Sequence, residues 1–222
     1  MSKSILIVGA GTGLSASLAR LFSKNDMKVI LASRNTNKLN KLKDEIDAIT
    51  INCDSSNIDD VSKLFHEVDK SFGTPNIVIY NPSSRIRGSI VDLDPNETLK
   101  AIKITTFGAF LVAQQATKRM LKRGSGAIFF TGASASIKGF ANSSVFAMGK
   151  FGLRGLAQSL ARELHPRNIH IGHFVIDGGI GVNHGQTLLH PDHIAQSYLE
   201  FYNQDRSSWS WELELRPWTE TF

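Results

Sequence analysis

The feature that most constrains the fold is a regular alternation between short apolar runs and longer segments with helical periodicity. The apolar runs are Ser4 to Val8, Lys28 to Ala32, Ile49 to Cys53, Asn76 to Tyr80, Gly126 to Thr131 and Ile169 to Ile176. They are apolar nearly throughout, as strands covered by helices on both faces are, whereas half-exposed antiparallel strands alternate apolar and polar residues. The alternation therefore predicts an α/β fold with a doubly wound parallel sheet.

The segments between these runs predict amphipathic helices. Apolar residues recur on one face of residues 14–24, and a similar stripe covers residues 58–68. Another helix is expected to begin at Asp94, with Pro95 in its first turn, and to continue to about Leu121.

Farther along, leucines at helical spacing predict a helix from near Ser144 to Leu164. Phe146 and Lys150 are four residues apart within it and so share a face. Trp209 to Leu215 alternates apolar and charged residues, which predicts a final edge strand.

Length and composition favour a single domain. The chain has 222 residues, of which 41% are hydrophobic, and this is enough for one substantial core. No repeat or interdomain linker divides it. We predict one domain over residues 1–222, with 181–206 as a substrate lid and helix, because the periodic pattern loosens after Ile180 and resumes after His190.

Several classes of function are disfavoured. The net charge is +5, but the largest basic cluster, residues 118–123, falls at a predicted helix end, where cations complement the helix dipole. No aromatic platform or nucleic-acid motif accompanies it, so we predict no nucleic-acid partner. No apolar run is long enough to span a bilayer, and the histidines match no metal motif. Cys53, the only cysteine, excludes an internal disulfide and fits the cytoplasm.

A glycine-rich turn follows the first apolar run, where residues 9–15 read Gly-Ala-Gly-Thr-Gly-Leu-Ser. A glycine turn between a strand and a helix lets the backbone approach a pyrophosphate closely, and the helix N-terminus offers free amides and a positive dipole. The residues expected to contact a dinucleotide here are Gly9, Gly11, Thr12, Gly13 and Leu14.

Together with residues 146–150, Phe-Ala-Met-Gly-Lys, this turn resembles a short-chain dehydrogenase/reductase, and the similarity covers roughly residues 4 to 180. In the GxxxGxG signature of that family, Gly9 and Gly13 occupy the first two glycine positions and Ser15 replaces the third. The resemblance implies a single Rossmann-type domain, oxidoreductase chemistry on a small molecule, and a homodimer or homotetramer.

The second predicted strand ends in Ser33-Arg34, without the carboxylate by which NAD-preferring relatives hold the adenosine ribose. Arginine can instead bind a 2′-phosphate through its forked, permanently charged donors, which predicts NADP(H) in preference to NAD(H). The resemblance assigns further cofactor contacts to Asp54, to Asn81, Pro82 and Ser83, to Lys150, and to Gly178 and Ile180.

The catalytic set of the family is largely replaced. Phe146 stands where the YxxxK motif has its tyrosine acid, Ala133 stands at the usual serine spacing, and Thr105 stands at the asparagine position. Only Lys150 remains, and loss of a general acid typically costs about 10²- to 10⁴-fold in rate. Asp177, in a strand-end turn, is a candidate replacement acid if burial raises its pKa, although turn aspartates commonly cap local amides instead.

Two hypotheses follow. The first is an NADP(H)-dependent oxidoreductase whose substrate needs less help from an acid, such as an imine or an activated alkene. The second is a catalytically inactive NADP(H)-binding pseudoenzyme or scaffold. NADPH oxidation across panels of carbonyl, imine and enoyl substrates distinguishes the two.

Overall fold

The apolar runs form one parallel sheet in the computed structural model, which describes residues 3–182 and 187–220. Its strands are β1 (Ser4–Val8), β2 (Lys28–Ser33), β3 (Ile49–Asn52), β4 (Ile77–Tyr80), β5 (Gly126–Thr131), β6 (Ile169–Ile176) and β9 (Glu212–Leu215). Their spatial order is β3-β2-β1-β4-β5-β6-β9, and every neighbouring pair is parallel. The predicted doubly wound, Rossmann-type sheet is confirmed.

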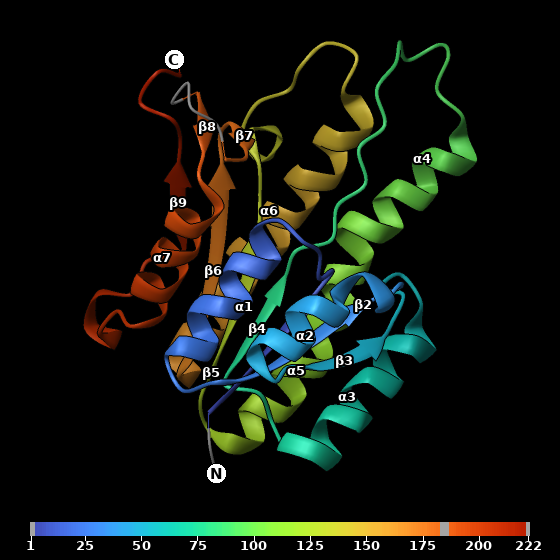
Figure 1. Ribbon diagram of the computed structural model, residues 1–222. Helices are drawn as coiled ribbons and strands as arrows, with labels where there is room; N and C mark the ends of the chain where they lie inside the picture. The colour runs from blue at the N-terminus through green and yellow to red at the C-terminus, as the bar shows by residue number, and fades with distance from the viewer. Residues whose placement is uncertain (1–2, 183–186, 221–222) are drawn as a thin grey trace.

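Helices cover both faces of the sheet (Figure 1). They are α1 (Leu14–Lys24), α2 (Asn40–Ile46), α3 (Ile58–Phe72), α4 (Pro95–Ile102), α5 (Gly108–Arg123), α6 (Ser144–Leu164) and α7 (Pro191–Tyr202). Alternate residues of each strand point to opposite faces, so Ile5 and Ile7 join a core with α1, α2 and α7, whereas Leu6 and Val8 join a core with α3, α5 and α6. This explains why β1, β2, β4, β5 and β6 are apolar nearly throughout, whereas the edge strand β9 alternates glutamate and leucine.

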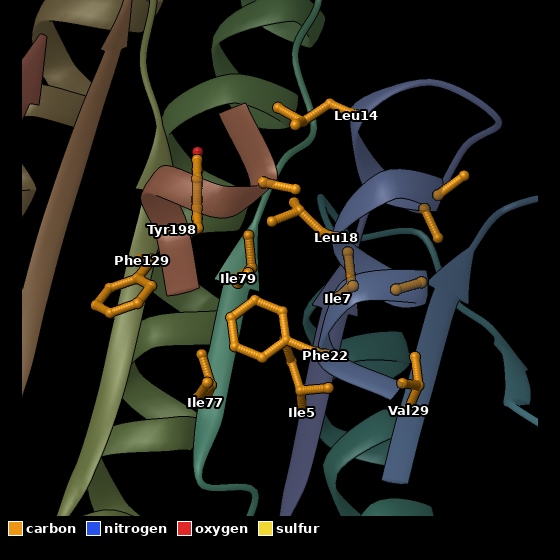
Figure 2. Close-up of a cluster of buried hydrophobic side chains, with 14 of the residues drawn as sticks. Ile5, Ile7, Leu14, Leu18, Phe22, Val29, Ile77, Ile79, Phe129 and Tyr198 are labelled. Atoms are coloured by element: carbon orange, nitrogen blue, oxygen red, sulfur yellow. The ribbon is translucent and has the colours of Figure 1, made fainter. Parts of the chain in front are cut away.

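The core beneath α1 positions the turn that precedes this helix. Figure 2 shows Phe22 of α1 lying among Ile5, Ile77 and Ile79 of the two central strands. Tyr198 of α7 packs in the same cluster, so residues far apart in the sequence form one apolar layer. Each fully buried side chain of this size contributes about 1.5–3 kcal/mol.

The helix expected from Asp94 to about Leu121 is not continuous. Its start is as predicted, because Asp94 accepts a hydrogen bond from the backbone of Glu97 at 2.8 Å and Pro95 opens α4. Between α4 and α5, however, residues Lys103–Phe107 form a π-helix. Such single-turn widenings of a helix are frequent at functional sites.

The segment predicted as a lid contains both irregular and core structure. Short strands β7 (Gly179–Ile180) and β8 (Leu188–Leu189) pair with each other, and residues 183–186 lie outside the described part of the chain. Helix α7 is packed against α1, with Ile194 and Tyr198 buried in the core. Only the residues before α7 could therefore act as a lid, and that role stays a prediction.

The predicted final edge strand is confirmed as β9. It pairs with β6, and side chains on three elements reinforce the contact. The guanidinium of Arg154 in α6 donates two hydrogen bonds to the carboxylate of Glu212, at 2.7 and 2.8 Å, and Nδ1 of His173 in β6 lies 2.9 Å from the same carboxylate.

Candidate functional site

Two cavities lie beside the carboxyl ends of the central strands. The larger has a volume of about 670 Å³ and the smaller about 290 Å³, and both are lined by Asn81 and Ser83, which follow β4. The strand order reverses between β1 and β4, and open α/β sheets bind ligands at such a switch point. The cavities therefore adjoin at the place where this fold is best suited to hold an extended ligand.

The glycine turn borders the smaller cavity and leaves its backbone accessible. Gly9 has φ +78°, and a Cβ there would lie 2.6 Å from Cγ of Pro82, so a side chain does not fit. At Gly11 and Gly13, by contrast, an added Cβ would meet no atom within 4 Å. No described side chain caps the start of α1, and Leu14 points into the core, so this end offers backbone amides to a ligand.

Ser15, which stands at the third glycine position of the family signature, connects the glycine turn to Asn81 through its hydroxyl. Its hydroxyl donates a hydrogen bond to the carbonyl of Gly9 at 3.4 Å and accepts one from the side-chain amide of Asn81 at 2.7 Å. This network joins the glycine turn to the end of β4. Asn81 is thus occupied in holding the turn, a function that only the three-dimensional arrangement reveals.

Two cationic side chains line the smaller cavity. Ser33, Arg34 and Asp54 line it, as does Lys38, which the sequence analysis missed. The only signal for Lys38 was a second cation four residues after Arg34.

Asp54, at the same cavity, is held as a carboxylate. It accepts hydrogen bonds from the backbone and hydroxyl of Ser56 at 2.9 and 2.7 Å. Burial raises the pKa of Asp54, but these hydrogen bonds and the charge of Arg34 outweigh it, so the pKa falls below its usual value.

The larger cavity brings together three of the four predicted catalytic positions. Lys150, Phe146 and Ala133 all line it. Lys150 is only 2% exposed, its ammonium donates a hydrogen bond to the carbonyl of Thr131 at 2.7 Å, and burial lowers its pKa to about 8. The Phe146 ring centroid is 5.8 Å from that ammonium, so an apolar ring and a buried amine face the same space.

Thr105, the fourth position, does not line either cavity. It lies in the π-helix, and its hydroxyl accepts a hydrogen bond from the backbone of Ser84 at 3.1 Å. The next residue, Thr106, donates a hydrogen bond to the carbonyl of Gly149 in α6 at 2.8 Å. The π-helix therefore links α6 to the loop that follows β4.

Asp177 does not meet the condition set for a replacement acid. One oxygen of its carboxylate accepts hydrogen bonds from Lys138 at 3.0 Å and Arg216 at 2.9 Å. Burial alone would raise its pKa, but a hydrogen bond from Ser134 and these ion pairs lower the pKa overall. Asp177 does not line the larger cavity, and its lowered pKa does not favour proton donation, so its role as an acid stays a prediction. Its neighbours Gly178 and Ile180 do line the cavity.

Two arginines in the loop after β4 also line the larger cavity and were not predicted. They are Arg85 and Arg87, and the guanidinium carbon of Arg85 lies 5.1 Å from the centroid of the Phe146 ring. The sequence signal was the alternation Ser83, Arg85, Arg87, because these three residues line the cavity whereas Ser84 and Ile86 between them do not.

Other types of site are not found in the described part of the chain. Within residues 3–182 and 187–220, no cluster of three or more histidine, cysteine, aspartate or glutamate side chains is arranged to hold a metal ion. Over the same ranges, no helix is both long and apolar enough to traverse a lipid bilayer.

Comparison with known proteins agrees with this geometry. Residues 3–187 match the short chain dehydrogenase family. A 3-oxoacyl-[acyl-carrier-protein] reductase, MabA, of Mycobacterium tuberculosis is 26% identical over 201 residues, covering 90% of this chain and 78% of that protein. An uncharacterized oxidoreductase of Staphylococcus aureus is 26% identical over 227 residues, covering 97% of both proteins.

Solved structures show the same arrangement of the chain. A short-chain dehydrogenase from Rhodopseudomonas palustris is 31% identical and superimposes with a TM-score of 0.88 over 97% of this chain and 99% of that one. A metagenomic short-chain oxidoreductase in complex with NADP is 22% identical, with a TM-score of 0.87 over 98% of both chains.

Proposed function

Because the chain belongs to the short-chain dehydrogenase family, we propose that it is an NADP(H)-dependent oxidoreductase acting on a small molecule other than a simple ketone. The observation that carries the proposal is the pair of adjoining cavities. One is lined by Arg34 and Lys38, the other is lined by Lys150, and both border Asn81. A dinucleotide with a charged end and a reactive end matches this layout.

The glycine turn fits the pyrophosphate of such a cofactor. The open space beside Gly11 and Gly13 lets a phosphate approach the backbone, and the N-terminus of α1 supplies amide donors and a favourable dipole. Gly178 and Ile180 border the larger cavity, where the family holds its nicotinamide. A reduced nicotinamide bound there supplies a hydride to an electrophilic carbon.

A preference for the phosphorylated dinucleotide is supported by the charges of the smaller cavity. Arg34 and Lys38 line it together, and two cations bind a 2′-phosphate more strongly than one. Asp54 lies on the same cavity, but its carboxylate is engaged by Ser56. The related solved structure that contains NADP is consistent with this preference.

The proton in this proposal comes from Lys150. Its pKa of about 8 leaves the amine mostly protonated at neutral pH and still able to release a proton. General acid catalysis works best with a pKa of this kind, close to the working pH. Phe146 and Ala133 carry no hydroxyl to polarise a ketone. We therefore propose an imine or a conjugated alkene as the substrate, because each is electrophilic without a tyrosine acid.

Calorimetry with NADPH and NADH tests the cofactor assignment. Wild-type protein is expected to bind NADPH more tightly, and Arg34→Ala and Lys38→Ala are each expected to weaken NADPH binding about tenfold with little effect on NADH. Arg167→Ala is the matched control, since Arg167 is exposed and borders neither cavity. Equal affinities of the wild type for the two dinucleotides would overturn the preference.

The missing hydroxyls at Phe146 and Ala133 also favour a second function, a pseudoenzyme or scaffold that binds NADP(H) without turnover. Steady-state NADPH oxidation with ketone, cyclic imine and enone panels separates the two. Turnover of imines or enones that is reduced by Lys150→Met supports the enzyme. Tight NADPH binding with no turnover on any panel supports the pseudoenzyme.

We also propose a cytoplasmic location. Cys53 is a free, buried thiol, and burial raises its pKa to about 12, which keeps it protonated and protects it from oxidation. A free thiol of this kind is typical of a reducing compartment.

A further inference from the structure

The charged residues that line the larger cavity are all positive, which the family resemblance does not explain. Arg85, Arg87 and Lys150 line it, and none of its described lining residues is an aspartate or glutamate. The rest of its lining is neutral, with apolar side chains that include Phe140, Phe146 and Ile176.

Within residues 3–182 and 187–220, the two arginines have no anionic partner. Among the described residues, the only contact recorded for Arg85 is the approach of its guanidinium to the Phe146 ring, and no ion pair or hydrogen bond engages Arg87. Surface arginines usually gain little from an ion pair, but an unpaired guanidinium over an aromatic ring keeps all of its donors for a ligand.

The loop that carries these arginines is anchored on both sides. The backbone of Ser84 donates to the Thr105 hydroxyl at 3.1 Å, and the backbone of Gly88 donates to the carbonyl of Asn142 at 3.0 Å. Asn142 itself lines the larger cavity. Arg85 and Arg87, whose side chains are exposed, therefore line the cavity from a segment whose backbone is fixed at two points.

From these observations we propose that the site selects an anionic substrate. Its carboxylate is bound by Arg85 and Arg87, and its apolar body rests against the Phe146 and Ile176 side of the cavity. Phe146, which replaces the family tyrosine, serves as the ring on which Arg85 is positioned. This inference rests on the proposed function, because it concerns the substrate of the same site.

A matched pair of ligands tests the proposal by binding alone. Cinnamate and cinnamamide have nearly the same shape, and each carries a conjugated alkene, but only cinnamate is charged at pH 7.5. Calorimetry on the NADP⁺-loaded protein is expected to give cinnamate about tenfold higher affinity. Arg85→Gln and Arg87→Gln are each expected to remove most of this advantage, whereas Arg167→Gln, which changes an exposed arginine outside the cavity, retains it.

The proposal would be overturned by equal affinity of the wild type for the two ligands, by no binding of either in the millimolar range, or by an advantage for cinnamate that persists in Arg85→Gln and Arg87→Gln. If those variants lose NADP⁺ affinity instead, the arginines serve the cofactor and the proposal is also wrong. Displacement of cinnamate by inorganic phosphate at equal concentration would replace the carboxylate with a phosphoryl group as the recognised anion.

Failure of the proposed function gives a different pattern. If NADP⁺ does not bind to any of the proteins, the same titrations on the unloaded protein still report whether Arg85 and Arg87 distinguish cinnamate from cinnamamide.

Discussion

Single residues decide which chemistry the cavity can perform, and Phe146 is the most influential. Its ring is 9% exposed, faces the space beside Lys150 and lies under Arg85. A phenyl group cannot donate a proton, so under the proposed function Phe146 cannot act as the general acid.

Restoring the hydroxyls should therefore create ketone reduction. We expect the double variant Phe146→Tyr/Ala133→Ser to raise the rate of NADPH oxidation with cyclohexanone by about 10²-fold, the lower range for a general acid. Phe72→Tyr, at a partly buried residue of α3 that lines neither cavity, is the control. Unchanged activity in a double variant that still binds NADPH would mean that the substrate, rather than the acid, limits the reaction.

The buried amine of Lys150 leads to a second prediction, which concerns how the stability of the fold changes with pH. Its pKa falls from 10.5 to about 8 in the folded protein because burial disfavours the charged form. Below pH 8 the lysine therefore costs about 3 kcal/mol of folding free energy, and between pH 8 and 10.5 the unfolded chain binds more protons, so this cost disappears as the pH rises. The hydrogen bond to Thr131 offsets about 1 kcal/mol.

Urea denaturation of wild type and Lys150→Met at several pH values measures the contribution of Lys150 to the free energy of unfolding. The other titrating groups are common to both proteins, so their effects cancel in the difference. Lys150→Met is expected to be more stable at pH 7 by about 2 kcal/mol, and its advantage should vanish by pH 10.5. A difference that stays constant with pH would contradict the assigned pKa.

At the scale of elements, the strands and most helices were predictable, and the exceptions have long-range causes. The strands could be located because burial on both faces demands uninterrupted apolar runs. The π-helix could not be, because Thr105 and Thr106 bond to Ser84 and to Gly149, which lie far from them in the sequence. The helical spacing of apolar residues does not predict such long-range hydrogen bonds.

The ion pairs of Asp177 could not be predicted for the same reason. Its two cationic partners, Lys138 and Arg216, are each 39 residues away in the sequence, on opposite sides of it. The sequence identified a carboxyl group at a strand end but gave no means of locating the cations that keep it ionised. Lys38, Arg85 and Arg87 were missed for a related reason, since isolated surface cations are common and only the cavities single these out.

The π-helix leads to a prediction about stability. Thr105→Val removes the acceptor for the Ser84 amide, so we expect a loss of about 1 kcal/mol in the free energy of unfolding, with weaker cinnamate binding because the loop carrying Arg85 is released. Thr117→Val is the matched control: the Thr117 hydroxyl is buried without a hydrogen-bond partner among the described residues, so the change should be neutral or stabilising. Denaturation of the two variants compares them directly, and equal effects would contradict the anchoring role of Thr105.

For the whole molecule, exposed aromatic side chains suggest how copies associate. Phe107, Phe110, Met148 and Phe151 are each between 38% and 50% exposed, and they come from the neighbouring π-helix, α5 and α6. Phe107 and Phe110 stack with their ring centroids 6.1 Å apart. Large apolar side chains gathered on packed helices are typical of an interface between subunits.

We therefore expect a homodimer or homotetramer that associates through these helices. Phe151→Glu places a charge within the apolar cluster and should shift the mass measured by light scattering towards the monomer. Ile58→Glu, at an exposed apolar residue on α3, should leave the mass unchanged. A wild-type protein that is monomeric at micromolar concentration would exclude the interface.

The packing of α7 on α1 has a consequence for biosynthesis. Leu18 and Phe22 of α1 share their apolar layer with Tyr198 of α7, so that layer stays open on the ribosome until residue 202 has left the exit tunnel. Until then the nascent chain exposes the apolar face of α1 to chaperones, so α1 reaches its final packing only after α7 has been synthesised.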